Sequence, residues 1–340
     1  MTDPTDPTDP TPTGLVRPLT VGGRVVVRHR LPDGSATDAL GDLLAADERS
    51  LRIGTRRGEV VVARADVLAA KPVPPPPARK GPPHTAIGTE DLERVMAEHW
   101  RPLERVDLGG WRLRASEGFT GRANSALALG DPGLPLHEAV AAVVDFHTSR
   151  GLQPLVAVAH PDDGLGEGTP LVDLLSATGW TVRTPTVVLT SATDDLPGAA
   201  EVPLPHGLRV ETATEPDDAW LERYHYQGLP SVPPAGRRIL VSADEQLFVR
   251  VLDGGATVAI ARGSLSPGWA GVTAVETLPS HRRRGLGRRV LAEVADWARS
   301  RGAVSTYLQV QGDNAAARAL YAGVGFTVHH AYHYRVAPQR

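Results

Sequence analysis

The sequence contains no cysteine. Disulfide bonds, thiolate catalysis and cysteine-ligated zinc or iron–sulfur sites are therefore excluded, and histidines and carboxylates are the only strong metal ligands left. The sequence also has no apolar run close to the ~18 residues that a membrane-spanning helix needs. We therefore expect a soluble protein.

A strong excess of one charge is missing as well. The formal net charge is −3 and the isoelectric point lies near 6.5, so there is no global basic field to favour nucleic-acid binding. The start of the chain, MTDPTDPTDPTPTG, has neither the basic segment nor the apolar core of a signal peptide. These absences make a cytoplasmic location the default expectation.

The 340 residues predict two or three domains. Residues 1–18 repeat Thr-Asp-Pro and are expected to form a disordered tail. Short β-branched runs between turn signals then predict a small SH3-like β-barrel over 19–72, with a structural or docking role. The prolines of KPVPPPPARKGPP predict a stiff linker over 73–85.

An internal repeat divides the rest of the chain. VVDFHTSRG at 143–151 is similar to VADWARSRG at 294–302, and LLSATGWTV at 174–182 is similar to LYAGVGFTV at 320–328. The repeat predicts two lobes of one α+β fold, 86–195 and 207–337, each with a mixed sheet flanked by helices.

The most distinctive stretch is SHRRRGLGRR, residues 280–289, with five arginines and two glycines. It lies between a predicted strand and an apolar pattern at helical spacing, so it is a strand-to-helix turn. Glycines let backbone amides approach an anion, and a helix N-terminus adds partial positive charge, which suits a pyrophosphate. A solvated helix start is the competing interpretation. The matching stretch of the first lobe, 129–138, is acidic and has no glycine at either matching position, so the second lobe is the predicted working lobe.

Two motifs resemble the GNAT superfamily of acyl-CoA-dependent N-acetyltransferases. The first is Arg282-x-x-Gly285-x-Gly287, and the second is Asn314-x-x-Ala317-x-x-Leu320-Tyr321-x-x-x-Gly325-Phe326. With the N-terminal β domain, the VPPPP linker and the segment GGWRLRASEGFTGRANSALAL (109–129), nearly the whole chain is similar to an actinobacterial group of GNAT proteins named histone-acetyltransferase-like. The resemblance implies direct acetyl transfer from acetyl-CoA to a primary amine, on a small molecule or a protein lysine, without a metal.

The resemblance also implies roles for individual residues. Tyr321 would protonate the departing thiolate, Glu276 would take the amine proton through water, and Tyr224, His225 and Tyr226 would line the acceptor pocket. A packed tyrosine and a solvated carboxylate are the alternatives for the first two. The residues implied to bind acetyl-CoA are Val275, Thr277, Arg282, Arg283, Arg284, Gly285, Leu286, Gly287, Arg288, Asn314, Ala317 and Tyr321.

Several alternatives stay open. Asn314 is also a plausible helix N-cap. GFTGRANS, 118–125, either reaches across the lobes to the acceptor or forms a structural turn. His329 and His333 lie on one face of a predicted strand and His330 on the other, so no metal site is predicted.

The main alternative function is a non-catalytic acyl-CoA-binding sensor whose β domain docks a protein partner. A modifier of nucleic acid has less support, because the β domain lacks a clear aromatic and basic face. The pairing of two lobes within one chain favours a monomer.

Overall fold

The computed structural model describes residues 19, 21–31, 34–55, 58–72, 81–161, 166–225 and 231–338. The chain divides into two compact units, Met1–Pro77 and Ala78–Arg340. In the described ranges, no helix has the length and apolar character needed to cross a membrane.

The first unit is a five-stranded antiparallel sheet. Its strands are β1 (Arg24–Arg30), β2 (Ala36–Ala46), β3 (Ser50–Thr55), β4 (Gly58–Ala63) and β5 (Val67–Pro72). Alternate residues such as Val25, Val27 and Ile53 point to one buried face, as the period of a strand requires. The order is β4-β3-β2-β1-β5. The predicted small β domain is confirmed, but the described strands form an open sheet, not a closed barrel, because β4 and β5 are not paired with each other.

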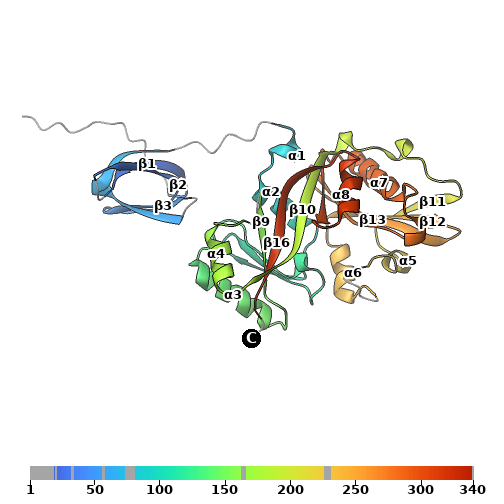
Figure 1. Ribbon diagram of the computed structural model, residues 1–340, viewed down its shortest axis with the longest axis horizontal. Helices are drawn as coiled ribbons and strands as arrows, with labels where there is room; N and C mark the ends of the chain where they lie inside the picture. Colours follow the sequence, from blue (N-terminus) through green and yellow to red (C-terminus); the bar gives the residue numbers. More distant parts are fainter. Residues whose placement is uncertain are drawn as a thin grey trace, which may run out of the picture. The chain divides into compact units, whose positions relative to one another are not determined.

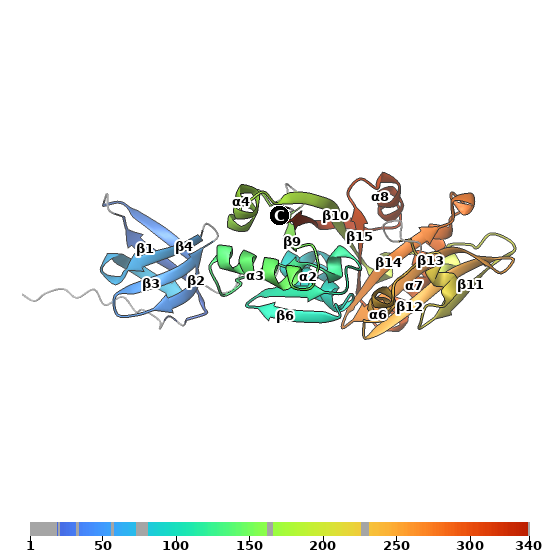
Figure 2. The ribbon, with the colours of Figure 1, turned by 90° about the horizontal axis from the view of Figure 1, so that it is seen from below.

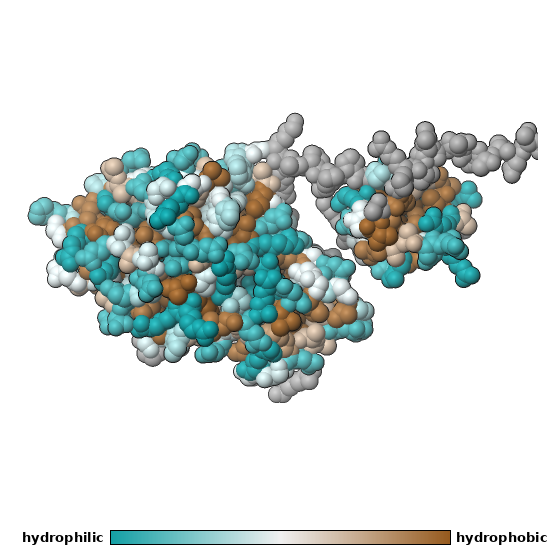
Figure 3. All heavy atoms as spheres, turned by 180° about the vertical axis from the view of Figure 1, so that it is seen from behind, coloured by the Kyte–Doolittle hydropathy of each residue, from teal (hydrophilic) through white to brown (hydrophobic). Residues whose placement is uncertain are grey.

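The second unit is built on one sheet of eleven strands (Figures 1 and 2). Its helices are α1 (Pro83–Ala86), α2 (Thr89–Glu98), α3 (Leu136–Thr148), α4 (Pro170–Ala177), α5 (Asp218–Leu221), α6 (Pro234–Leu240), α7 (Leu286–Ser300) and α8 (Ala315–Ala322). Its strands are β6 (Glu104–Leu108), β7 (Trp111–Ala115), β8 (Ala126–Leu127), β9 (Leu155–His160), β10 (Thr181–Ala192), β11 (Leu208–Ala213), β12 (Glu245–Asp253), β13 (Ala256–Ser266), β14 (Trp269–Thr277), β15 (Ser305–Gln311) and β16 (Thr327–Val336). Figure 3 shows hydrophilic residues spread over much of the visible face of this unit.

Residues 83–85, which we expected in the linker, begin helix α1. The Thr190 hydroxyl on β10 donates a hydrogen bond to the His84 carbonyl at 2.8 Å. This end of the predicted linker is therefore part of the second unit, and residues 73–80 lie outside the described ranges.

The internal repeat falls on matching elements. The order β8-α3-β9-α4-β10 in the first lobe recurs as β14-α7-β15-α8-β16 in the second. Each lobe has its own apolar core, built around Val143 on α3 and around Val290 and Val294 on α7. The tandem arrangement of two α+β lobes is confirmed, whereas the boundaries 86–195 and 207–337 stay predictions.

The two lobes exchange their last strands. β10, which ends the first lobe, lies between β15 and β16, and β16, which ends the second lobe, lies between β10 and β9. Leu189 on β10 is opposite Leu308 on β15, and Tyr334 on β16 is opposite Ala157 on β9. Figure 1 shows β10 and β16 side by side between α3 and α4 at one end and α7 and α8 at the other. The exchange makes one continuous sheet of two lobes.

Candidate active site

Two parallel strands part in the second lobe and open a cleft. β14 and β15 pair only from Trp269 opposite Ser305 to Val272 opposite Leu308. Beyond that point β14 follows β13 alone, and Ala274, with φ of 56°, lies in an irregularity of their register. A bulge of this kind bends a strand away from its neighbour. The cleft that results has a volume of about 520 Å³.

The cleft brings together residues from two predicted segments. Val275 and Glu276 line it from β14, Asn314 lies at the start of α8, and Ala317 and Tyr321 are on that helix. Thr277, the last residue of β14, lies opposite Ala259 and is not among the lining residues.

Tyr321 is the most enclosed ionisable group of the predicted set. Only 7% of the residue is exposed, and its ring meets Phe326 edge-on at a centroid distance of 6.2 Å. Burial raises the pKa of Tyr321 to about 12, because the phenolate loses its hydration. The hydroxyl therefore keeps its proton at neutral pH and is a potential donor on the cleft wall.

Glu276 is held by His225 at the edge of the same cleft. The His225 amide donates to Glu276 Oε1 at 2.9 Å, and His225 Nδ1 lies 3.0 Å from Oε2. Burial raises the pKa of Glu276, and the hydrogen bonds from His225 oppose that rise only in part. A carboxylate with a raised pKa in a cleft is suited to accept a proton.

The arginine-glycine turn lies at the N-terminus of α7. Gly285 precedes the helix with φ of 81°, and the first helical hydrogen bond joins the Arg289 amide to the Gly285 carbonyl. The amides of Leu286, Gly287 and Arg288 precede this first helical hydrogen bond, and such first-turn amides have no acceptor within a helix. A Cβ atom on Gly287 would lie 3.1 Å from Leu320 Cδ2, so glycine allows α7 and α8 to approach.

The five arginines of this turn divide into two groups. Arg282, Arg283 and Arg284 are exposed beside the helix start, and the Arg282 Nε lies 3.4 Å from the Thr277 carbonyl. Arg288 donates to the Gly323 carbonyl at 2.9 Å, and Arg289 pairs with Glu293. The first three are placed to meet an external anion, whereas the side chains of the last two hold α7 to its surroundings.

Asn314 has the capping role that the sequence left open. Its Oδ1 accepts a hydrogen bond from the Ala317 amide at 3.1 Å, which makes it the N-cap of α8. Since Asn314 also lines the cleft, this geometry is compatible with a contact to a ligand.

The predicted acceptor residues lie in different surroundings. The half-buried Tyr224 stacks on Trp220 at 5.6 Å and lies 6.4 Å from Phe119, and it is not among the residues that line the cleft. His225, the second of the three predicted acceptor residues, lines the cleft. Tyr226 lies outside the described residues.

The first lobe contributes a charged residue to the cleft of the second. Arg122 lies 4.4 Å above the Trp100 ring and donates from Nη1 to Gln309 Oε1 at 2.5 Å. The turn that carries it is held by Asn124, whose Oδ1 accepts from the Ser116 and Gly118 amides. Segment 118–125 is thus both a structural turn and a wall of the cleft.

Sequence analysis missed most of the wall built by the exchanged strands. Tyr332 and Tyr334 reach the cleft from β16, and Arg183 and Thr186 reach it from β10. In the sequence HHAYHYRV, only the histidines were considered as candidate site residues, and the tyrosines were not. Within the described part of the chain, no cluster of three or more histidine or acidic side chains could hold a metal ion.

Comparisons of structure show which fold this is. A tandem GNAT protein from the clavulanic acid biosynthesis pathway superposes with a TM-score of 0.55 at 15% identity, over 77% of this chain and 92% of that one. The fold is therefore that of the tandem GNAT proteins, as the two motifs predicted.

Comparisons of sequence show the family. The family described as "Probable histone acetyltransferase Rv0428c C-terminal" matches residues 89–335, and "Rv0428c N-terminal Sm-like domain" matches residues 19–71. The probable histone acetyltransferase Rv0428c of Mycobacterium tuberculosis is 30% identical over 325 residues, which cover 92% of this chain and 94% of that protein. The uncharacterized N-acetyltransferase YobR of Bacillus subtilis is 25% identical over 72% of this chain and 97% of its own length. The chain belongs to the Rv0428c family of GNAT N-acetyltransferases.

Proposed function

We propose that the second lobe transfers an acetyl group from acetyl-CoA directly to a primary amine. The observation that carries this proposal is the parting of β14 and β15 beside the N-terminus of α7, with Tyr321 and Glu276 in the same cleft. Acetyl-CoA supplies an activated thioester carbonyl to an uncharged amine.

The residues fit an elongated anionic thioester. The helix-start amides of 286–288 and the exposed Arg282, Arg283 and Arg284 suit a pyrophosphate. The edge of β14 from Val275 to Thr277, no longer paired with β15, offers backbone groups to an amide-containing arm. Asn314 and Ala317 form the opposite wall.

Two proton transfers follow from the environment of the two ionisable groups. Glu276 accepts the proton that the attacking amine loses, directly or through water, and His225 fixes the orientation of the carboxylate. The Tyr321 hydroxyl, kept protonated by burial, donates to the departing sulfur.

Arg122 favours an acceptor that carries an anionic group. The described residues place no carboxylate in ion-pair contact with this guanidinium, whose polar partner is the neutral Gln309 amide. An arginine in a cleft with few acidic side chains forms stronger, charge-assisted hydrogen bonds when a ligand supplies a carboxylate or phosphate. We therefore propose an acceptor amine with an acidic group within reach of Arg122.

A thiol-release assay tests the function. Because the chain has no cysteine, a thiol reagent detects released coenzyme A with no contribution from protein thiols. The protein is incubated with acetyl-CoA and a panel of amines with and without carboxylates, together with lysine-containing peptides. Saturable, amine-dependent thiol release supports the proposal. Binding of acetyl-CoA without release across the panel would contradict it.

A further inference from the structure

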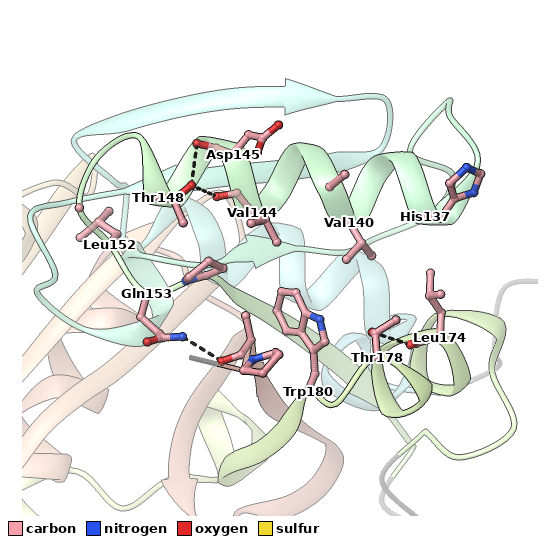
Figure 4. A pocket seen from close by; sticks show the side chains of 15 residues that line it. His137, Val140, Val144, Asp145, Thr148, Leu152, Gln153, Leu174, Thr178 and Trp180 are labelled. Atoms are coloured by element: carbon pink, nitrogen blue, oxygen red, sulfur yellow. Dashed lines mark hydrogen bonds between the residues drawn. The ribbon is translucent and has the colours of Figure 1, made fainter. Parts of the chain in front are cut away.

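A second cavity lies in the first lobe, away from the cleft. It is a groove of about 670 Å³ between α3 and α4. Figure 4 shows Val140 and Val144 on α3 facing Trp180 and Leu174 across it, with Asp145 at the rim. The described chain reaches one end of the groove at Pro338.

The internal repeat relates this groove to a covered face of the second lobe. Val140 and Val144 correspond to Leu291 and Ala295 of α7, and Trp180 corresponds to Phe326. The three second-lobe residues belong to one buried apolar cluster, which also contains Leu196. Leu196 belongs to residues 193–202, the connector between the lobes.

The connector is held on α7 by its backbone. Asp296 accepts a hydrogen bond from the Ala199 amide at 2.8 Å. Arg299 donates to the Thr193 and Leu196 carbonyls at 2.8 and 3.0 Å. Arg289 donates to the Ala199 and Val202 carbonyls, each at 2.8 Å. A short segment that contains two 3-10 turns, Thr193–Asp195 and Ala199–Glu201, and has Leu196 as its buried aliphatic residue thus covers this face of the second lobe.

The chain enters the two sites at matching places. A Cβ atom on Gly325 would lie 3.7 Å from the Asp195 carbonyl oxygen, and a Cβ atom on the corresponding Gly179 would lie 3.9 Å from Pro338 Cγ. Residues 196–202 cover α7, whereas no described residue covers the corresponding face of α3, which lines the groove.

The covered face of the second lobe and the groove of the first lobe differ in the exposure of corresponding residues. Ala292 and Val324 are buried under the connector side of α7 and α8, at 0% and 6% exposure. Their counterparts Ala141 and Thr178 are exposed and line the open groove.

Two α7 residues that contact the connector can be compared with their counterparts on α3. One counterpart is the same residue type, and the other has the opposite charge. Asp145 corresponds to Asp296, so a carboxylate is again available for a backbone amide. Glu138, next to the groove-lining His137, stands where α7 has Arg289, and its side chain is 55% exposed. Acidic groups at both positions favour an occupant with a basic side chain.

We propose that the groove binds a short peptide segment of a partner protein. The segment inserts one aliphatic side chain beside Val144 and Trp180, donates a backbone amide to Asp145, and places a lysine or arginine near Glu138. This inference concerns the first lobe and is independent of acetyl transfer in the second.

The connector itself supplies the probe. Two fluorescein-labelled peptides are titrated with the full chain: TDDLPGAAEV, the sequence of residues 193–202, and TDDLPGAAKV, in which the residue that corresponds to Glu201 is lysine. Fluorescence anisotropy should give saturable binding, with Kd of about 10–100 µM because one short segment orders on binding. The lysine peptide should bind several-fold more tightly, and Glu138→Gln should remove that preference.

Three variants locate the binding. Thr178→Arg should weaken binding at least ~10-fold by filling the groove with a charged chain. Thr181→Arg, at an exposed position outside the groove lining, is its matched control and should leave Kd unchanged. Asp145→Ala should weaken binding, and Asp145→Asn, which keeps an oxygen acceptor, should restore most of it.

Two results would overturn the proposal. One is the absence of saturable binding of both peptides up to millimolar protein. The other is binding that Thr178→Arg and Asp145→Ala leave unchanged while the melting temperatures show that both variants are folded.

Discussion

Arg122 of the first lobe donates a hydrogen bond to Gln309 of the second, which follows Leu308, the last residue of β15 that pairs with β14. The contact joins residues 187 positions apart in the sequence. The guanidinium of Arg122 thus comes from the first lobe, which lacks the cofactor-binding motifs. It lies where β14 and β15 part and the cleft opens.

Replacing Arg122 should alter acceptor recognition more than acetyl-CoA binding. For Arg122→Met we expect KM for a carboxylate-bearing amine to rise ~10-fold or more, because a charge-assisted hydrogen bond contributes about 1.5–3 kcal/mol. Kinetics with a neutral amine of the same size should change little. An equal loss for both amines would assign Arg122 to holding the lobes together.

Tyr321→Phe should reduce turnover and spare binding. Loss of a positioned general acid lowers kcat by about 100-fold or more. Calorimetric titration should still show acetyl-CoA binding with an affinity close to that of the wild type. A variant with undiminished kcat would leave Tyr321 as a packed residue of α8.

The pH dependence of transfer should report Glu276. Since burial raises the pKa of this carboxyl above its ordinary value of 4.5, the basic form is lost at a higher pH than for an exposed glutamate. We expect the acidic limb of the kcat/KM profile to have an inflection above 4.5. Glu276→Gln should remove this limb together with most of the activity, and an unchanged limb would assign it to another group.

Glycine at the start of α7 should be required for acetyl-CoA binding. Gly285→Val forces a β-branched residue into φ of 81°, which costs about 1–2 kcal/mol, and Gly287→Val brings side-chain atoms against Leu320. The double variant should lose calorimetric binding of acetyl-CoA.

Gly302 provides the control for those two glycines. It follows α7 with φ of 77° and has no atom within 4 Å of the position of a Cβ. Gly302→Val should therefore have the same backbone strain as Gly285→Val and retain full acetyl-CoA binding. Equal loss in both variants would mean that the effect comes from helix stability.

His99 should make the protein sensitive to acid. Burial lowers the pKa of His99 to about 3, helped by the charges of Arg262 and Arg101, and its Nε2 lies 2.7 Å from the Ser266 hydroxyl. Because its pKa is lower in the folded state than its ordinary 6.5, the neutral ring stabilises the fold above pH 6.5. That stability is lost as pH falls, by about 1.4 kcal/mol per pH unit.

Urea denaturation at pH 7 and pH 5 measures this effect. His99→Asn should lose about 2 kcal/mol less than the wild type between these pH values. His206→Asn, at an exposed position, should behave as the wild type does. The same loss in all three proteins would exclude His99 as the acid-sensitive group.

The parts of the site that are local in sequence were predictable, and those that depend on strand exchange were not. Gly285, Asn314 and Tyr321 lie within one strand-helix-strand-helix unit, where spacing alone identifies the turn and the caps. Tyr332 and Arg183 reach the cleft because β10 and β16 cross between lobes, and Arg122 reaches it from the turn 118–125 of the first lobe. A period-2 pattern predicts the faces of a strand and contains no information on which strand becomes its neighbour.

The internal repeat also predicted which elements of the two lobes correspond, but it did not predict how their strands pair. Offsets between VVDFHTSRG and VADWARSRG identified α3 and α7 as counterparts. The open first unit differs from the expected barrel for a similar reason, since pairing of its two edge strands depends on sheet curvature and not on composition.

The crossing of β10 and β16 has a consequence for biosynthesis. β10 can pair with β15 and β16 only after more than a hundred further residues have been translated, since Leu189 pairs with Leu308 and Val187 with Ala331. Until then the first half of the nascent chain exposes one unpaired edge of β9 and both edges of β10, and such edges favour aggregation. Chaperone dependence and slow refolding are therefore expected of this topology, and the two halves should not be obtainable as separate folded fragments.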